Sequence, residues 1–407
     1  MKFLICLLAL SFWNLTASSS RISPHGLEHK QPKNFNIDIG KTVVVGQSGA
    51  THFKTIQAAI DSVPSGNNKW IKIQLQNGIY FEKIVIPMEK EKIILQGNNP
   101  LEVIIQYNDA GQASSSGPMI VNAEYFIAIN VTFKNSYNSI ASVVPYKKIK
   151  VAPSIVLLAD KAWFYGCSFI SVQDTLADLV GRHYFKNCYI EGAIDFIWGG
   201  GQSLYEKCVI YVKAMMNVKG MMNDEMVKSG AMLPGFITAQ GRQSEQDTSG
   251  FVFKFCTIKG DGTAALGRAY RGYSRVVFYA TNMSNVIVPQ GWDAWHYKGE
   301  EDKITFVEVK CTGEGANKQG RVGWEKNLSD TDIDFLINTK TFIAGDGWMT
   351  TLPSSLHIYI KCLGKLALSS VNIMLMLPLY ICILYSLIKH NTIIYLFYYI
   401  LQLSREF

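Results

Sequence analysis

A short phrase of aromatic and β-branched residues returns about every twenty residues through the middle of the chain, and this repeat limits the possible folds more than any other feature of the sequence. Each copy places an aromatic residue three or four positions before a cysteine or asparagine. The copies span residues 126–133, 164–170, 184–190, 205–210 and 253–258, with a weaker sixth at 277–283. Fixed periods of this length are typical of solenoids, in which each repeat packs on its neighbours.

The spacing of the cysteines gives the length of one coil. Cys167, Cys188 and Cys208 follow one another at steps of 21 and 20 residues, about one turn of a solenoid that adds short strands to parallel sheets. The longer step to Cys256 indicates loops inserted between strands. We therefore predict an all-β parallel β-helix. The competing interpretation is a β-sandwich, but its antiparallel hairpins would not require the same phrase in every coil.

The returning cysteines are expected to form a ladder inside the helix. Neighbouring coils lie about 4.8 Å apart, within the range of about 4.4 to 6.8 Å that a disulfide needs between Cα atoms, yet ladder neighbours point the same way. A buried column of thiols is favoured, while one disulfide within it and a metal site stay open. Asn130 starts the sequon Asn130-Val-Thr, and we expect it at the ladder position and without a glycan.

The apolar residues gather at both ends of the chain, which holds 48% hydrophobic and 17% charged residues. Residues 1–20 have a lysine, an apolar run and small residues, which predicts a secretory signal rather than a buried first strand. Residues 354–407 form an apolar tail, which is a membrane anchor, a lipid-anchor signal or a non-native extension of the gene model. The functional domain is then 40–353. Its mild positive charge is insufficient to imply nucleic-acid binding.

Two aspartates stand one coil apart. Asp174 and Asp195 are separated by 21 residues, so we expect them on adjacent turns of the same face. Two carboxylates so close cannot be equivalent: one is pushed toward its protonated form, and a nearby cation holds the other ionised. Arg268 could supply that cation through a bidentate contact. A lone aspartate in such a fold usually closes a turn, and only the one-coil spacing favours an acid paired with a nucleophile or base.

Several motifs together resemble those of plant pectinesterases (pectin methylesterases), which hydrolyse methyl esters of galacturonan in the cell wall. In chain order the motifs are Phe53-Lys-Thr-Ile-Gln-Ala-Ala-Ile, Gly78-Ile-Tyr-Phe-Glu-Lys, Gln173-Asp-Thr-Leu, Gly181-Arg-His-Tyr-Phe, Asp195-Phe-Ile-Trp-Gly, Leu266-Gly-Arg and Gly291-Trp. The resemblance runs from about residue 40 to Pro353. It implies a right-handed, single-stranded parallel β-helix, no metal or organic cofactor, and a member without the N-terminal inhibitor-like region.

The resemblance also assigns roles. It makes Asp195 the nucleophile, and Asp174 the acid that protonates methanol and then the base that activates water. Gln173 would donate to the oxyanion, and Arg268 would hold Asp195 charged and oriented. Three aromatic residues would form walls for the sugar rings: Tyr270, Trp292 and Trp198.

The implied partner is methyl-esterified homogalacturonan, together with a proteinaceous pectinesterase inhibitor. The protein is expected to be a monomer secreted to the cell wall, with no nucleic-acid partner. A galacturonan hydrolase or lyase of the same fold is disfavoured, because the further paired acids with a Gly-His-Gly loop, or the clustered calcium-binding acids, are not found in the sequence. A catalytically weak or inactive pectin-binding wall protein is the alternative.

The sequence departs from the family at two places. Val151 stands where the family usually has a glutamine, nine residues before Asp160, so one oxyanion donor is missing. Such a loss costs about 10²- to 10³-fold in rate if nothing replaces the donor. The usual Arg-Pro-Trp appears as Arg268-Ala-Tyr, which keeps the charge and an aromatic ring but loses the rigid proline.

Three further candidates have mainly structural explanations. His183 could carry a proton, but a single histidine at the start of a strand is more often structural. Glu82 is expected to close a turn by hydrogen bonding. Lys147, Lys148 and Lys150 are expected to be a solvated loop, with contact to unesterified galacturonate as the functional alternative.

Overall fold

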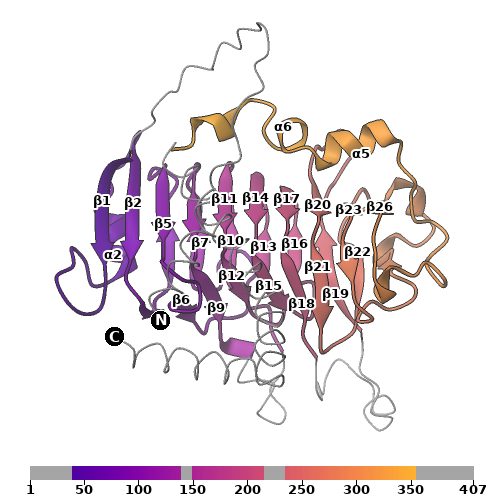
Figure 1. Ribbon diagram of the computed structural model, residues 1–407, viewed down its shortest axis with the longest axis horizontal. Coiled ribbons are helices and arrows are strands. Elements are labelled where there is room, and N and C mark those ends of the chain that lie inside the picture. Colours follow the sequence, from indigo (N-terminus) through magenta and orange to yellow (C-terminus); the bar gives the residue numbers. More distant parts are fainter. Residues whose placement is uncertain (1–38, 139–148, 215–233, 354–407) are drawn as a thin grey trace, which may run out of the picture. The chain divides into compact units, whose positions relative to one another are not determined.

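The computed structural model describes residues 39–138, 149–214 and 234–353, and these residues wind into a parallel β-helix of three sheets (Figure 1). The strands of all three sheets pair in parallel. The β-sandwich is therefore excluded, and the fold class is the predicted one. The predicted signal and tail lie outside the described residues. No helix within the described ranges is long and apolar enough to cross a membrane.

Sheet A is the largest sheet, with ten strands in the order in which the chain forms them. Its strands are β1 (Ile39–Val45), β2 (Trp70–Leu75), β5 (Ile93–Gln96), β8 (Ile127–Ile129), β11 (Ala162–Tyr165), β14 (Arg182–Lys186), β17 (Gln202–Glu206), β20 (Gly250–Lys254), β23 (Arg275–Tyr279) and β26 (Thr305–Val309).

Sheets B and C have eight strands each. Sheet B holds β3 (Gly78–Phe81), β6 (Val103–Tyr107), β9 (Thr132–Asn135), β12 (Ser168–Ile170), β15 (Tyr189–Gly192), β18 (Val209–Val212), β21 (Thr257–Gly260) and β24 (Asn282–Met283). Sheet C holds β4 (Ile84–Ile86), β7 (Met119–Val121), β10 (Ile155–Leu157), β13 (Leu176–Asp178), β16 (Ile197–Gly199), β19 (Gly235–Gln240), β22 (Ala264–Ala269) and β25 (Trp292–Asp293).

The helices are short and lie at the margins of the β-helix. They are α2 (Ile56–Asp61), α5 (Asp330–Ile337), α6 (Thr339–Phe342) and the 3₁₀ turns η1 (Trp295–Tyr297), η2 (Glu301–Lys303), η3 (Glu314–Ala316) and η4 (Trp348–Thr351). Buried residues of α5 and α6 pack with the outward side chains of sheet A in one apolar cluster. The C-terminal helices therefore cover one sheet and leave the other two to be considered for function.

The repeated phrase is the corner between sheets A and B. Each copy supplies a sheet A strand, one residue with positive φ and then a sheet B strand. The corner residues are Asn130, Gly166, Asn187, Lys207, Phe255, Ala280 and Lys310, with φ between 46° and 61°. A residue in the left-handed region turns the chain sharply, so one such residue per coil lets the same short phrase recur.

The cysteine ladder follows directly after this corner. Cys167, Cys188, Cys208 and Cys256 are buried and Cys311 is half-buried, and all five are free thiols. Their Sγ atoms lie 3.4 to 3.6 Å from main-chain carbonyl oxygens, to which the thiols donate weak bonds. Burial raises the pKa of Cys167 to about 12. Of the three options that the sequence leaves open, the structure has the thiol ladder.

The position of Asn130 corrects one expectation. Asn130 pairs with Gly166 at the corner, and Val131 is the residue that aligns with Cys167, as the Thr132 to Ser168 register requires. The expected place was wrong by one residue, because a strand of aromatic and aliphatic residues gives no mark of where the turn begins. Asn130 is nevertheless buried, with 7% of its surface exposed.

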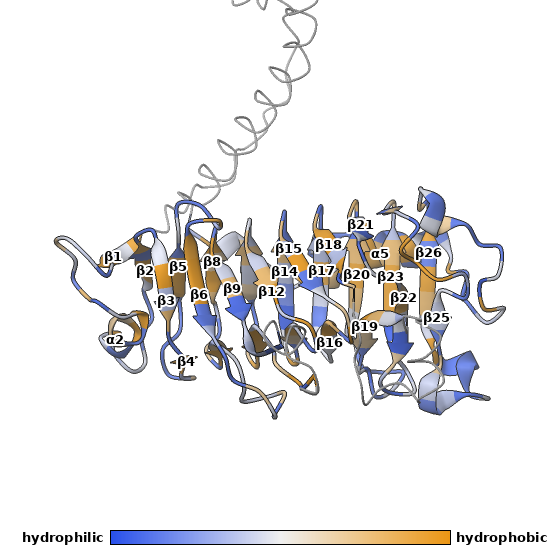
Figure 2. Ribbon diagram, turned by 90° about the horizontal axis from the view of Figure 1, so that it is seen from below, coloured by the Kyte–Doolittle hydropathy of each residue, from blue (hydrophilic) through white to orange (hydrophobic). Residues whose placement is uncertain are grey.

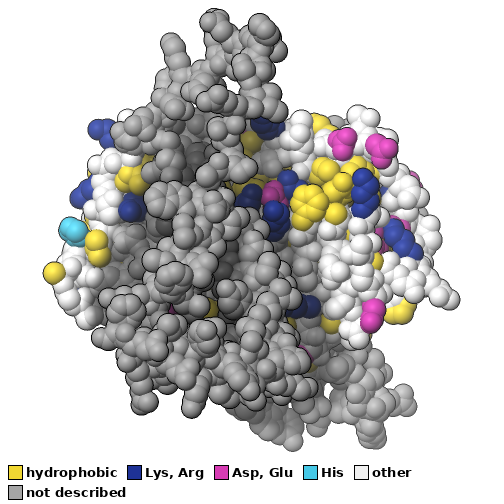
Figure 3. All heavy atoms as spheres, viewed as in Figure 1, with side chains coloured by type: hydrophobic (Ala, Val, Ile, Leu, Met, Phe, Trp, Pro, Cys, Tyr) yellow, Lys and Arg dark blue, Asp and Glu magenta, His cyan; other side chains and the backbone are white. Residues whose placement is uncertain are grey.

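The core is a continuous stack of aromatic and aliphatic side chains inside the coils. Phe164, Phe185, Tyr205, Phe253 and Phe278 stack in sequence, with ring centroids 4.4 to 4.8 Å apart. Figure 2 shows the apolar strands along the body of the helix, and Figure 3 shows basic and acidic side chains interspersed over one face. Because these five consecutive coils share one stack, the corners that they contain, including those that carry chemistry, are fixed relative to one another.

Candidate active site

Asp174 and Asp195 occupy the same corner of two consecutive coils, between sheet B and sheet C. Asp174 lies between β12 and β13, and Asp195 lies between β15 and β16. Both have positive φ, 59° and 47°, which aspartate tolerates better than most residues. The N–H of Asp174 donates to the carbonyl of Ile194 at 3.0 Å. The two aspartates therefore lie on adjacent coils, as their spacing predicts.

Arg268 binds one of the two aspartates. It lies on β22, and its Nε donates to Oδ1 of Asp195 at 2.8 Å while Nη2 donates to Oδ2. The contact is the bidentate pair that favours a carboxylate in its charged form. Asp195 and Asp174 are 8% and 7% exposed, so this pairing takes place where water screens charge poorly.

The two carboxyl groups have different electrostatic surroundings. Burial raises the pKa of Asp174 to about 8, the charge of Asp195 adds to the rise, and Arg268 opposes it. Burial also raises the pKa of Asp195, but here the guanidinium opposes the rise through direct hydrogen bonds. Within the described part of the chain, no side chain hydrogen-bonds to the Asp174 carboxyl. The proton near neutral pH therefore belongs on Asp174, and the negative charge belongs on Asp195.

Gln173 and Val151 lie on adjoining coils beside the aspartates. Gln173 is half-buried, and its carbonyl accepts from the N–H of Ala152 at 3.3 Å. Val151 is half-buried in the segment before β10, and its carbonyl accepts from the N–H of Gly111 at 2.9 Å. The side chain of Val151 has no N–H to donate, so the missing amide that the sequence indicates is not supplied by this residue.

Two of the three predicted wall residues lie together beside Arg268. Trp198 is the outward residue of β16, and its ring meets that of Tyr270 edge-on at 5.8 Å between centroids. Both side chains are half-buried. Rings with one covered and one open side can stack against sugars.

Trp292 was expected in the same wall, and this expectation is wrong. Its side chain is 1% exposed and stacks on Phe306 at 4.5 Å inside the core. The cause is strand alternation: Arg268 points outward, so its neighbour Gly267 and the paired Trp292 must lie on the inner side. A Cβ at Gly267 would lie 2.1 Å from Oγ1 of Thr238 and 3.3 Å from the Trp292 ring, so glycine leaves room for both side chains.

The sequence interpretation missed two aromatic residues at the site. Trp295, three residues after Trp292, lies with its ring centroid 4.1 Å from Cζ of Arg268. Phe236 lies on β19, the strand on the other side of β22, and its ring centroid lies 4.6 Å from Cζ of Arg268. Strand alternation indicates that Trp292 is buried only once β25 is known to pair with β22. No signal in the sequence marked Phe236, because it follows residues 215–233, where the repeat phrase is interrupted.

The remaining candidates have structural roles. His183 is fully buried inside the helix, with Nδ1 2.5 Å from Oδ1 of Asp178 and Nε2 2.7 Å from the carbonyl of Ala159. Burial opposes protonation of the ring, but Asp178 outweighs it and raises the pKa of His183. Glu82 accepts from the N–H groups of Ile56 and Gln57, so it does hydrogen-bond to a turn, as expected.

The lysine loop is only partly within the described residues. Lys147 and Lys148 lie outside them. Lys150 is described, and its Nζ lies 5.8 Å from the centroid of the Tyr137 ring.

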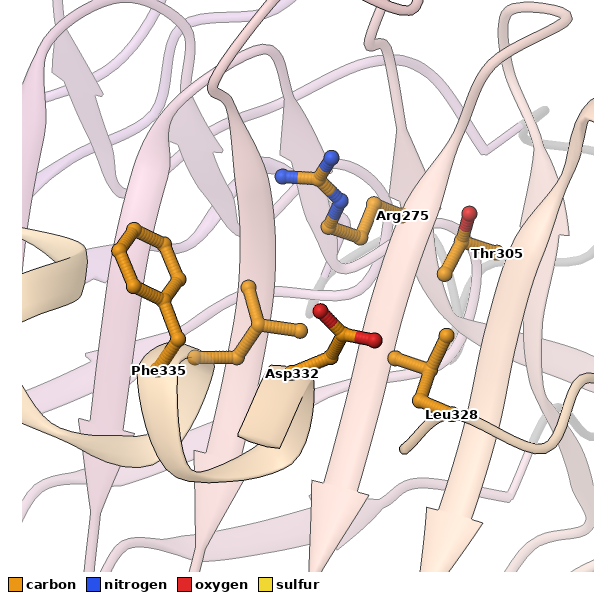
Figure 4. A pocket seen from close by; sticks show the side chains of 6 residues that line it. Arg275, Thr305, Leu328, Asp332 and Phe335 are labelled. Atoms are coloured by element: carbon orange, nitrogen blue, oxygen red, sulfur yellow. The ribbon is translucent and has the colours of Figure 1, made fainter. Parts of the chain in front are cut away.

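A pocket on another part of the molecule is separate from this site. It has a volume of about 320 Å³ and is lined by Arg275, Thr305, Leu328, Asp332, Phe335 and Leu336 (Figure 4). The lining comes from sheet A, from α5 and from the segment before that helix, on the side that the C-terminal helices cover. It contains one carboxylate and no paired acid, so the aspartate pair remains the candidate active site.

Most of the chain matches a known protein family. The family model described as Pectinesterase matches residues 42–346. The Arabidopsis thaliana protein "Probable pectinesterase 29" is 43% identical over 313 residues, which are 76% of this chain and 89% of the relative.

Solved structures agree with the sequence comparisons. The pectin methylesterase from carrot is 26% identical, with a TM-score of 0.67 over 78% of this chain and 98% of that one. A pectin methylesterase mutant in complex with a hexasaccharide, 23% identical, shares the fold with a TM-score of 0.63 over 76% of this chain and 98% of that one. The family match, the 43% identical relative and the shared β-helix lead to one conclusion: this chain belongs to the pectinesterase family.

Proposed function

We propose that this carboxylic ester hydrolase removes methyl groups from esterified homogalacturonan and releases methanol. The bound hexasaccharide of the structural relative supports an oligosaccharide ligand for this fold. Arg268 holds Asp195 through direct hydrogen bonds, and no described cation bonds to the carboxyl of Asp174. The pair thus supplies a charged nucleophile and a protonated acid on adjacent coils. This asymmetry is the observation that carries the proposal.

The first half-reaction forms an acyl-enzyme. An Oδ atom of Asp195 attacks the C6 carbonyl carbon of a methylated galacturonate, and the carbonyl oxygen becomes an oxyanion to which Gln173 donates. When the tetrahedral intermediate collapses, the C–O bond to the methoxy group breaks. Asp174 gives its proton to that oxygen, so that methanol leaves and Asp174 becomes a carboxylate.

The second half-reaction restores the enzyme. Asp174, now charged, takes a proton from water, and the resulting hydroxide adds to the C6 carbon. The bond between C6 and Asp195 breaks, which frees the aspartate as a carboxylate and leaves a galacturonic acid group that ionises in solvent. Both carboxyl groups end in the state in which they began.

The aromatic residues beside the pair provide the sugar-binding surface. Trp198 and Tyr270 offer half-buried rings on one side of Arg268. An uncharged methyl ester suits such apolar walls better than a free carboxylate does, because the ester does not lose a charged hydration shell on binding. The substrate is therefore the esterified polymer and the product is its acid form.

The proposal also includes the location, the oligomeric state and an inhibitor of the protein. We place it outside the cell, in the wall that contains the polymer, as a monomer that a proteinaceous inhibitor can block. The basis is the leader-like composition of residues 1–20 together with family membership.

Methanol release from highly methylated pectin tests the activity. The purified protein is compared with Asp195→Asn, an isosteric change that keeps the packing but has no charge with which to attack. We expect the variant to lose activity by at least about a thousandfold, the order seen when a nucleophile is removed, while its circular dichroism and pectin binding are unchanged. Turnover by Asp195→Asn within tenfold of the parent would remove Asp195 as nucleophile. A parent that binds pectin without releasing methanol would instead be the inactive wall protein.

A further inference from the structure

The guanidinium of Arg268 is enclosed by two aromatic rings. Its Cζ lies 4.1 Å from the centroid of the Trp295 ring and 4.6 Å from that of the Phe236 ring. Both distances are well within the roughly 6 Å over which a cation is attracted to the face of an aromatic ring. The edge of the same guanidinium donates its two bonds to Asp195. Both rings therefore contact the group whose edge binds the carboxylate.

A second carboxylate is available to the same arginine. Asp293 is the direct strand neighbour of Arg268, since β22 pairs with β25 in that register. Asp195 lies before β16, which is separated from β22 by β19. Arg268 thus extends across β19 to a carboxylate two strands away, and no ion pair in the described ranges joins it to Asp293, which is one strand away.

The conformation of residues 293–295 explains this choice. Oδ1 of Asp293 accepts a hydrogen bond from the N–H of Trp295 at 2.8 Å, which turns that carboxylate toward its own main chain. Trp295 has a positive φ of 52°, uncommon for a residue other than glycine, and this conformation brings its ring to Arg268. Strain of this kind persists when the surrounding contacts hold it and often accompanies function.

We propose that Trp295 and Phe236 are positioning residues that hold the Arg268 guanidinium on the nucleophile, and that Asp293 fixes Trp295 for this purpose. Without the Trp295 ring, the guanidinium rotates and divides its time between Asp195 and Asp293. Asp195 then loses part of the charge that keeps it ionised and oriented. This inference rests on the proposed role of Asp195 in ester hydrolysis.

Steady-state kinetics distinguish a positioning role of Trp295 from direct contact of its ring with the sugar. Trp295→Leu removes the ring but keeps apolar bulk, and we expect kcat to fall about tenfold, the size that a partly desolvated cation–π contact allows, with KM changed by less than about threefold. The acidic limb of the pH profile moves to higher pH, because the pKa of Asp195 rises when its cation is less well held. Phe236→Leu changes the same quantities in the same direction.

Two matched comparisons complete the set. Trp295→Phe keeps a ring over the guanidinium, so we expect it to recover most of the lost kcat. Phe255→Leu removes a ring that is 49% exposed at a corner between sheets A and B. We expect this control to leave kcat and the pH profile as in the parent. Asp293→Asn keeps an oxygen that can accept from the N–H of Trp295, so it loses less activity than Asp293→Ala. If Trp295→Leu raises KM at constant kcat and an unmoved pH profile, the ring is only a substrate wall and the proposal is wrong.

A measurement without substrate keeps the inference independent of the activity. The ¹⁵N signal of the Arg268 Nε–H, identified by its loss in Arg268→Lys, reports how long the bond to Asp195 lasts. We expect its hydrogen exchange to be about tenfold faster in Trp295→Leu than in the parent and Trp295→Phe. Parent-like exchange in Trp295→Leu overturns the positioning role even in an active enzyme. Faster exchange in a protein that releases no methanol supports the clamp while the proposed hydrolysis fails.

Discussion

The proposed chemistry depends on a difference between Asp174 and Asp195, two side chains that are buried to a similar degree. Among the described residues, Arg268 forms an ion pair with Asp195 alone, whereas burial and the charge of Asp195 raise the pKa of Asp174. A single arginine, two strands away from Asp195, therefore favours the ionised form of Asp195 and leaves the proton on Asp174.

The raised pKa of Asp174 makes the stability of the folded protein depend on pH. Its pKa is raised from 3.8 to about 8, so the folded state keeps a proton that the unfolded state loses between those values. Stability of the parent therefore falls as pH rises through this window and levels off above about 8. Asp174→Asn cannot ionise and should show a rising advantage in Tm over the parent from about pH 4 to about pH 8. A constant difference in Tm across this range would mean that Asp174 is not proton-bound.

Val151 is the residue at which this chain has lost a donor. We predict that Val151→Gln raises kcat by about tenfold or more, with little change in KM, because the new amide would stabilise charge that appears only in the transition state. The main-chain bond from Gly111 to Val151 is unaffected by the change. Val151→Leu is the matched control, since it adds bulk but no N–H. Equal rates for the glutamine variant, the leucine variant and an already fast parent would show that another group fills the oxyanion role.

The elements show which parts of the fold could be predicted from the sequence. The corner between sheets A and B was visible because an aromatic residue followed by a cysteine or an asparagine returns in successive coils. The strands of sheet C were not visible, since Leu176–Asp178 and Ile197–Gly199 are short and contain a charge or a glycine. The adjacency of the aspartates followed from their spacing alone. The burial of Trp292 did not, because strand alternation settles it only when the partner strand is known.

Glu82 connects the segment after β3 to the first turn of α2. Its carboxylate accepts from the N–H groups of Ile56 and Gln57 at the first turn of α2 at 3.0 to 3.1 Å, from the segment between β3 and β4. Glu82→Ala leaves those N–H groups without an acceptor and should lower the free energy of unfolding by about 1 to 2 kcal/mol. Glu82→Gln keeps an acceptor and should lose less. Denaturant titration measures both, and equal stability of the parent and the alanine variant would contradict the capping role.

At the scale of the whole molecule, the described coils contain a complete core and the full candidate site. Apolar clusters run from β1 to the turn that ends at Thr351, and sheet A is covered by α5 and α6 from within the same range. The domain limits of 40–353 remain a prediction, although the family match lies inside them.

Truncation tests these limits. A protein of residues 21–353 should be soluble, melt cooperatively and release methanol at the rate of the full chain, because the repeats and the aspartate pair all lie within it. Calorimetry and size-exclusion chromatography measure this. Aggregation or loss of cooperative melting in the fragment, beside a well-folded full chain, would mean that residues after 353 belong to the core.

The stacked coils also determine where the gene can gain or lose codons. Between β18, which ends at Val212, and β19, which begins at Gly235, the chain carries a long insertion, and the strands on both sides still pair in register with their neighbours. Between Asp174 and Asp195 the chain completes one coil through β13, β14 and β15, and only short turns separate these strands. A one-codon deletion within β15 would turn the side chains before or after it to the wrong face of the sheet and shift Asp195 relative to Asp174. Length is therefore free at one corner of this enzyme and fixed within the strands that join its two carboxylates.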